Sequence, residues 1–157
     1  MVAILNLLRK NIRRNKRSKI ILIDSHYNET TGISTVVIEY KGKRYNAYST
    51  LAEEDKQFAS NLTGCRYAYE KAVIKALKAE RLEALNKCEE IRKFVKALQN
   101  YKNFDSESPT AKAVYRQLNR RIKEVDNLTI VINKKIFGLH QDFAKQNIVN
   151  NGIKGRE

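Results

Sequence analysis

Apolar residues recur at helical spacing along two long stretches of the chain. In residues 55–100, apolar and small side chains follow one another at steps of three and four, and no proline interrupts them. Between Ala111 and Phe143, apolar residues recur about every 3.6 residues, which is the period of an α-helix. Because only a short polar segment separates the two stretches, the sequence predicts an antiparallel α-helical hairpin over residues 61–150.

The segment from Ile20 to Thr50 has a different pattern. It contains three runs of β-branched and aromatic residues, separated by short polar segments that each contain a glycine, Gly32 and Gly42. This arrangement predicts a three-stranded antiparallel β-meander, in which the glycines supply the positive φ that tight hairpins need. Before it, residues 1–17 predict a short amphipathic helix.

Together these elements predict an α+β fold: a short basic N-terminal helix, a three-stranded antiparallel β-meander and a long α-helical hairpin. No linker divides the sequence, so we expect a single α+β unit over residues 1–157. Within it, residues 1–60 would form the N-terminal helix and meander, and residues 151–157 a frayed tail.

Several positions mark where elements begin or bend. Ser108 and Pro109 are typical of an N-cap followed by the first helical residue, and Thr50 with Glu53 fits a capping box. Gly64 would either bend the first helix or let another backbone approach it closely. Two questions stay open: whether residues 55–100 form one continuous helix, and whether the β-branched run 128–133 is helix or strand.

The charge of the chain is uneven. Lys and Arg number 31 against 17 acids, for a formal net charge of +14, which favours an anionic partner such as nucleic acid. The densest run is Arg9–Lys19, where seven of eleven residues are basic, and residues 1–20 contain no acid. A phosphate-binding helix face and a merely solvated helix both fit this run. Binding to a membrane surface would need a larger apolar face.

Further cationic positions lie outside this run. Cations recur at helical spacing on both long helices. On the second helix they are Arg116, Arg120 and Lys123, with Lys134 further along. On the first helix they are Lys71, Lys75 and Lys78. Strand residues Lys43 and Arg44 stand among tyrosines that would serve either base stacking or sheet packing. The residues expected to bind nucleic acid or a partner are Arg9, Lys10, Arg13, Arg14, Lys16, Arg17, Lys19, Lys43, Arg44, Arg116, Arg120 and Lys123.

No known catalytic motif, zinc spacing or phosphate-binding glycine loop occurs in the sequence, so we expect no enzymatic activity, no metal site and no cofactor. His26 and His140 stand alone as surface or capping residues. Cys65 and Cys88 fall on apolar-stripe positions of one helix, which predicts two buried, unpaired thiols in a reducing cytoplasm. No apolar run is long enough to span a bilayer, so we expect a cytoplasmic protein of the host cell with no membrane partner.

A resemblance covers residues 40–80. This stretch resembles a module of small accessory proteins of Gram-positive phages and plasmids, in which a β-hairpin precedes an Asp-x-x-Phe-x-Ser start, a Thr-Gly pair and an alanine-rich helix. The resemblance implies an origin in a mobile element, and that class includes some anti-defence (anti-CRISPR) proteins. The matching residues are Glu54, Asp55, Phe58, Ser60, Thr63, Gly64, Ala68, Lys71 and Ala72.

The order helix, three strands, helix over residues 1–80 is also similar to the double-stranded RNA-binding domain. In that domain a Lys-Lys pair begins the closing helix, whereas this chain has two glutamates and an aspartate in that region, residues 53–55.

Three functions remain as hypotheses. The first is a non-enzymatic basic phage or mobile-element protein that binds nucleic acid, DNA or RNA, or a nucleoprotein complex through Lys and Arg surfaces. The second is an anti-CRISPR type inhibitor that binds a host effector nuclease directly. The third is a structural protein that forms a homodimer through the helical hairpin.

Overall fold

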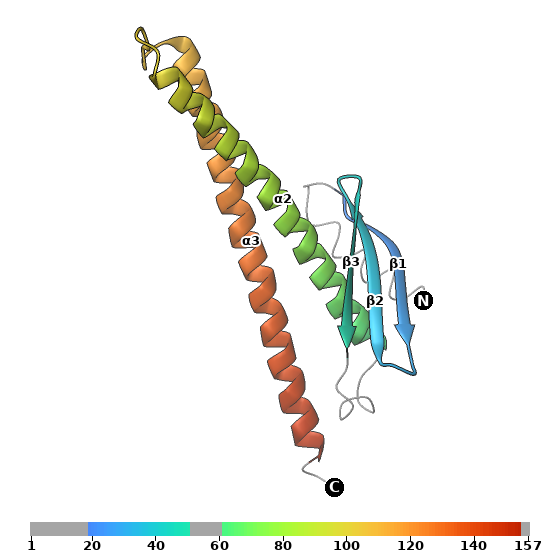
Figure 1. The fold of residues 1–157 in the computed structure, drawn as a ribbon. Coiled ribbons are helices and arrows are strands. Elements are labelled where there is room, and N and C mark those ends of the chain that lie inside the picture. Colours follow the sequence, from blue (N-terminus) through green and yellow to red (C-terminus); the bar gives the residue numbers. More distant parts are fainter. Residues whose placement is uncertain (1–18, 51–60, 155–157) are drawn as a thin grey trace. The chain divides into compact units, whose positions relative to one another are not determined.

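The computed structural model of the protein describes residues 19–50 and 61–154, with side chains over residues 19–50 and 63–145. It confirms the expected α+β class, a three-stranded sheet followed by two long helices (Figure 1). The N-terminal helix expected over residues 1–17 lies outside the described residues, as does the capping box that Glu53 would complete. The elements are β1 (Ile21–Asn28), β2 (Ile33–Tyr40), β3 (Lys43–Thr50), α2 (Asn61–Gln99) and α3 (Pro109–Lys154).

The strands form the predicted antiparallel meander, in the order β1-β2-β3. Lys41 and Gly42 join β2 to β3, and their φ angles of 52° and 74° both lie in the left-handed region, as two-residue hairpin loops require. In the turn between β1 and β2, Asn28 Oδ1 accepts hydrogen bonds from the backbone amides of Thr30 and Thr31, and Gly32 has a φ of 67°. Glycine therefore supplies positive φ in both connections, as the sequence predicts.

The chain falls into two compact units. Of the described residues, unit 1 contains the sheet, residues 61–76 of α2 and residues 135–154 of α3. Unit 2 contains residues 77–134, which are the remaining parts of both helices and the loop that joins them. Both helices continue without interruption from one unit into the other.

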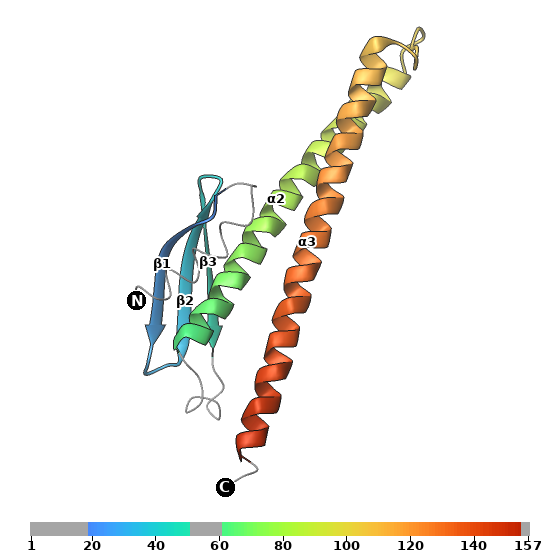
Figure 2. The ribbon, with the colours of Figure 1, turned by 180° about the vertical axis from the view of Figure 1, so that it is seen from behind.

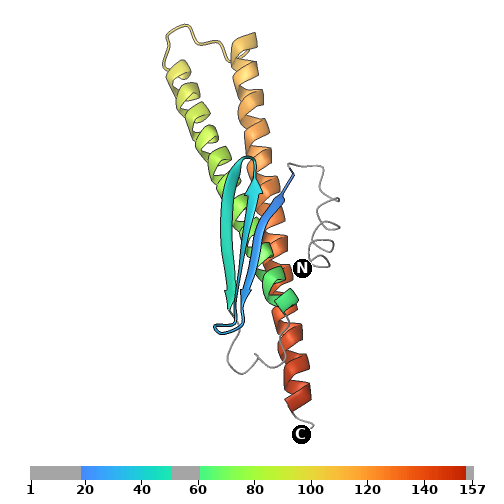
Figure 3. The ribbon, with the colours of Figure 1, turned by 90° about the vertical axis from the view of Figure 1, so that its right-hand side faces the viewer.

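The core of unit 1 lies between the sheet and α2. Alternate residues of β2 are buried, with Val36 and Ile38 fully inaccessible to solvent. Figure 3 shows α2 beside the sheet, and this buried face is the one toward α2, because Ser34 belongs to it and lies against Gly64. The helix approaches closely at Gly64, where a Cβ atom would overlap Ser34 Oγ and lie 3.2 Å from Ser34 Cβ. Of the two roles that the sequence allows for Gly64, the structure thus has the close approach.

On its other side, α2 packs against the C-terminal part of α3, so that α2 lies between the sheet and α3 in unit 1 (Figures 1 and 2). The rings of Tyr67 and Phe143 stack with their centroids 4.2 Å apart and an angle of 17° between their planes. Two ion pairs accompany this stack, Lys135 Nζ with Glu70 Oε2 at 2.8 Å and Arg66 with Asp142 at 2.9 Å.

Helix α3 extends to Lys154, so it includes the first four residues of the segment 151–157 that the sequence predicts as a tail. Gly152 lies inside the helix. A glycine costs a helix interior only about 1 kcal/mol relative to alanine, so it does not end a helix unless other signals accompany it.

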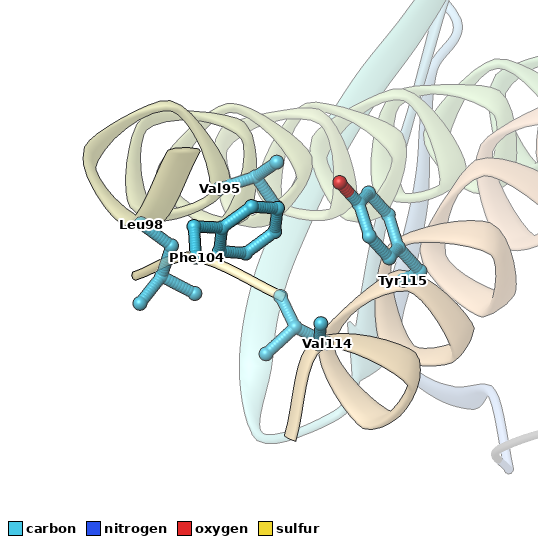
Figure 4. Close-up of a pocket in the computed structure, with 6 residues that line it drawn as sticks. Val95, Leu98, Phe104, Val114 and Tyr115 are labelled. Carbon is cyan, nitrogen blue, oxygen red and sulfur yellow. The ribbon is translucent and has the colours of Figure 1, made fainter. Parts of the chain in front are cut away.

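Unit 2 is the antiparallel helical hairpin that the sequence predicts. Ser108 caps α3, because its Oγ accepts a hydrogen bond from the amide of Ala111 at 3.2 Å, and Pro109 is the first helical residue. At the tip of the hairpin, Phe104 from the loop lies against α2 beside Val95 and Leu98 (Figure 4). This apolar cluster is completed by three residues of α3, Ala111, Val114 and Tyr115. No space large enough for a water molecule remains inside it.

The structure answers one of the questions that the pattern left open and part of the other. Residues 61–99 form one continuous helix, whereas residues 55–60 of the predicted stretch lie outside the described residues. The β-branched run 128–133 belongs to α3, where Leu128 and Ile132 are buried four residues apart. The hydroxyl of Thr129 donates to the carbonyl oxygen of Val125 at 2.8 Å, a bond within the helix. Burial of one helical face therefore outweighs the strand preference of these residues.

Candidate nucleic-acid interface

Four cations lie in line on the exposed side of α3 in unit 2. Arg116, Arg120 and Lys123 occupy positions i, i+4 and i+7, and Lys134 follows at i+18, five full turns after Arg116. All four side chains are exposed, while Leu128, on the other side of the helix, is buried. We call these four residues the α3 ridge. At 1.5 Å per residue it extends over roughly 27 Å.

The charge of the α3 ridge is not neutralised within the described part of the chain, where no carboxylate forms an ion pair with any of its four side chains. Neighbouring cations differ in this respect. Lys112 pairs with Glu107 at 2.7 Å, and Arg121 pairs with Glu124 at the same distance. Segment 109–134 carries six Lys and Arg against two acids, so the ridge is a line of positive charge.

The predicted strand residues do not form a common surface. Lys43 and Arg44 are both exposed, but as neighbours in β3 they point to opposite faces of the sheet. Tyr40 is buried, Tyr45 is half-buried opposite Ile38, and Tyr48, 66% exposed, lies on the other face. These tyrosines and cations therefore do not share one surface, because alternate residues of a strand point to opposite faces of the sheet.

The lysine stripe of α2 serves the sheet. Lys71 Nζ donates to the carbonyl oxygen of Tyr48, and Lys75 Nζ donates to the carbonyl and side-chain oxygens of Asn46, all at 3.3 Å. Because β3 is an edge strand, these ammonium groups cover carbonyls that no strand pairs. The spacing of lysines on a helix does not reveal backbone acceptors on another element, so the sequence alone could not identify these contacts.

The other predicted residues divide as follows. Lys19 is exposed two residues before the start of β1, in unit 1. Asn127 lies on the face of the α3 ridge, eleven residues or about three turns after Arg116, and it is exposed. The helical spacing that identified the cations also places this amide, but a search restricted to charge omits it. Six residues of the basic run lie outside the described residues: Arg9, Lys10, Arg13, Arg14, Lys16 and Arg17.

Two tyrosines of unit 1, Tyr67 and Tyr69, have raised pKa values. Burial raises the pKa of Tyr69 to about 12, and the charge of Glu70 acts in the same direction. Burial also raises the pKa of Tyr67, with a further rise from Asp142 and an opposing effect of Arg66. Both side chains are buried, although positions two residues apart point to nearly opposite sides of a helix, so these pKa shifts reflect burial on two sides of α2.

In the described ranges, side chains of His, Cys, Asp and Glu nowhere gather in a group of three that would hold a metal ion. Over the same ranges, neither helix has an apolar stretch that would carry it across a membrane. Cys65 and Cys88 are buried and unpaired, as expected.

Comparisons with protein-family models, with curated proteins and with solved structures found no match. The class of the protein is thus defined by its own fold and surface. It is an α+β protein in which a sheet-and-helix unit continues into a helical hairpin that carries a cationic ridge.

Proposed function

We propose that the protein is a non-enzymatic basic accessory protein of a phage or another mobile element, and that it binds nucleic acid, free or within a nucleoprotein complex. The observation that carries this proposal is the α3 ridge, whose four exposed cations have no ion-pair partner among the described residues. The mobile-element origin rests on the sequence resemblance of residues 40–80.

Electrostatics explains why such a ridge favours a polyanion. Like charges at i and i+3 or i+4 destabilise an isolated helix by about 0.2–0.5 kcal/mol per pair, so Arg116, Arg120 and Lys123 repel one another. A phosphate backbone replaces that repulsion with attraction, and each phosphate that a cation neutralises releases a condensed counterion. A single phosphate or carboxylate could satisfy only part of a ridge of this length.

The basic run Arg9–Lys19 supports the same function. Its seven Lys and Arg residues in eleven positions would add phosphate contacts to those of the α3 ridge. The two segments need not contact the same phosphates, because this electrostatic term depends mainly on the number neutralised.

Binding of the full-length protein to labelled duplex DNA, single-stranded DNA and structured RNA should be measured by fluorescence anisotropy as KCl is raised. We expect the logarithm of the binding constant to fall linearly with the logarithm of the salt concentration, with a slope of about −0.9 for each phosphate neutralised on a duplex. The triple variant Arg116→Ala/Arg120→Ala/Lys123→Ala should make that slope shallower by about 2.7, three such contacts.

A matched control removes the same charge from α2 through Lys87→Ala/Lys93→Ala/Lys96→Ala, three exposed residues of the same unit. It should change the slope much less. The proposal fails if no nucleic acid binds in a salt-dependent manner, or if the two triple variants behave alike. Capture of a host nuclease by a protein that binds no free nucleic acid would also contradict it and would favour the inhibitor hypothesis.

A further inference from the structure

We infer that the α3 ridge binds in the major groove of duplex DNA and reads base edges there, in preference to duplex RNA or single strands. This inference rests on the proposed function and specifies the form of nucleic acid that the ridge takes.

The first argument is the chemistry of the side chains on the ridge face. Between the cations of the ridge stand Asn127, exposed, and Ile130, which is 52% exposed. Arginine makes bidentate hydrogen bonds to guanine O6 and N7, asparagine to adenine N6 and N7, and apolar groups contact the thymine methyl. A surface that only held phosphates would need cations alone, whereas this face also has an amide and an aliphatic side chain.

The second argument is shape. An α-helix with its side chains is about 10–12 Å across, and the major groove of B-DNA is about 12 Å wide and 8.5 Å deep, so the exposed half of α3 fits it. The inner side of α3 is covered by α2 within unit 2, as the buried Leu128 and Ile132 show, so α2 would remain outside the groove. The deep, narrow major groove of A-form RNA does not admit side chains in this way.

The third argument favours a duplex over single strands. Proteins that bind single strands stack bases on exposed aromatic rings. The segment of α3 in unit 2 has one aromatic residue, Tyr115. Its ring is half-buried in the hairpin cluster, and its hydroxyl accepts a hydrogen bond from Gln99 Nε2 at 3.2 Å. Within unit 2 the ridge therefore offers no stacking platform; the next aromatic residue of α3, Phe137, is 64% exposed but follows Lys134, beyond the end of the ridge.

The test uses the full-length protein and the best-binding duplex selected from a random-sequence DNA pool. Its affinity should exceed that for the matching duplex RNA and for either single strand by roughly tenfold or more. Replacing its purines with 7-deazapurines, which lack the N7 acceptor, should weaken binding by about tenfold, a typical value for one lost base contact. Asn127→Ala should have a loss of similar size and leave the salt slope unchanged, because asparagine carries no charge. The control Asn86→Ala, an exposed amide on α2, should bind as the wild type does.

Each contrary outcome is informative. Salt-dependent binding that is equal or stronger for duplex RNA or single strands would overturn the inference and leave the proposed function intact. The same holds if 7-deazapurines and Asn127→Ala have no effect, which would indicate contacts to phosphates alone. Absence of binding to every nucleic acid would remove the proposed function and the inference together.

Discussion

Ser34 and Gly64 determine how closely α2 packs on the sheet. Ser34 is fully buried, and its hydroxyl has no hydrogen-bond partner in the described part of the chain. An unsatisfied buried hydroxyl costs about 1–3 kcal/mol, so the hydroxyl of Ser34 does not itself stabilise the fold. What Ser34 contributes is its small volume, which leaves room for α2 at Gly64. Opposite Gly64, a larger side chain would push the helix away from the fully buried Val36 and Ile38.

We therefore expect Gly64→Ala to destabilise the protein by about 1–3 kcal/mol, the usual cost of overpacking. The control Gly138→Ala, at a helical position with nothing within 4 Å of the added Cβ, should instead stabilise it by up to about 1 kcal/mol. Urea unfolding followed by circular dichroism measures both. Combining Gly64→Ala with Ser34→Gly should cost less than the sum of the single changes. Equal effects of the two glycine substitutions would refute the close contact.

Tyr69 gives a prediction for alkaline pH. Its pKa is raised to about 12, so the folded state holds the phenolic proton more tightly than the unfolded chain, whose tyrosine pKa is about 10. The buried, protonated phenol therefore contributes its full stability below about pH 10, and this contribution is lost as the pH rises through about 12. Tyr69→Phe should reduce the fall in unfolding free energy over this window, as measured by urea titration at several pH values. Tyr101→Phe, at a 74% exposed site, should leave the fall unchanged; an unchanged fall in Tyr69→Phe would contradict the prediction.

Each long helix uses different faces for different contacts along its length. In unit 1, α2 has small residues toward the sheet, lysines toward the edge of β3 and Tyr67 toward α3. In unit 2 its buried residues, such as Cys88, belong to the hairpin. A helix of 39 residues can hold such a sequence of contacts because its faces repeat every 3.6 residues.

The loop residue Phe104 should stabilise the hairpin tip. It is half-buried against Val95 and Leu98, so Phe104→Ala should cost roughly 1–3 kcal/mol, less than the 3–5 kcal/mol typical of a phenylalanine in a core. The nearby Tyr101 is 74% exposed, and Tyr101→Ala should cost little. Hydrogen exchange at amides near the tip, residues 95–115, should accelerate in the first variant and not in the second. Comparable exchange in both variants would show that Phe104 does not hold the helices together.

For the molecule as a whole, the net charge of +14 opposes the compact state through self-repulsion. The described ion pairs, including Lys112 with Glu107 and Arg121 with Glu124, neutralise individual cations but not the α3 ridge. Unbound protein therefore retains a repulsion that either salt or a bound polyanion would reduce.

Thermal stability should consequently rise with NaCl. The Debye length falls from about 30 Å at 0.01 M to about 8 Å at 0.15 M, which screens repulsion along a ridge of roughly 27 Å. If screening recovers about 1 kcal/mol, the thermal midpoint rises by about 2–4 °C. The Arg116→Ala/Arg120→Ala/Lys123→Ala variant should show a smaller rise in differential scanning calorimetry. If the thermal midpoint is independent of salt, or rises equally in the variant, then repulsion within the α3 ridge does not lower the stability of the protein.

The sequence by itself determined the fold class and most element positions. It did so through the period of the apolar residues, the glycines of both hairpins and the Ser108-Pro109 pair at the start of α3, because these signals act between neighbours in the sequence. The same period placed Arg116, Arg120 and Lys123 on one exposed helix face. Only the tertiary structure decided which cations remain unpaired and what Gly64 contacts. Lys71 and Lys75 have the same spacing as a free stripe, yet they bond to carbonyls of β3. The physical reason is that periodicity fixes the direction of a side chain from its own helix, whereas its partner depends on which other segment packs there.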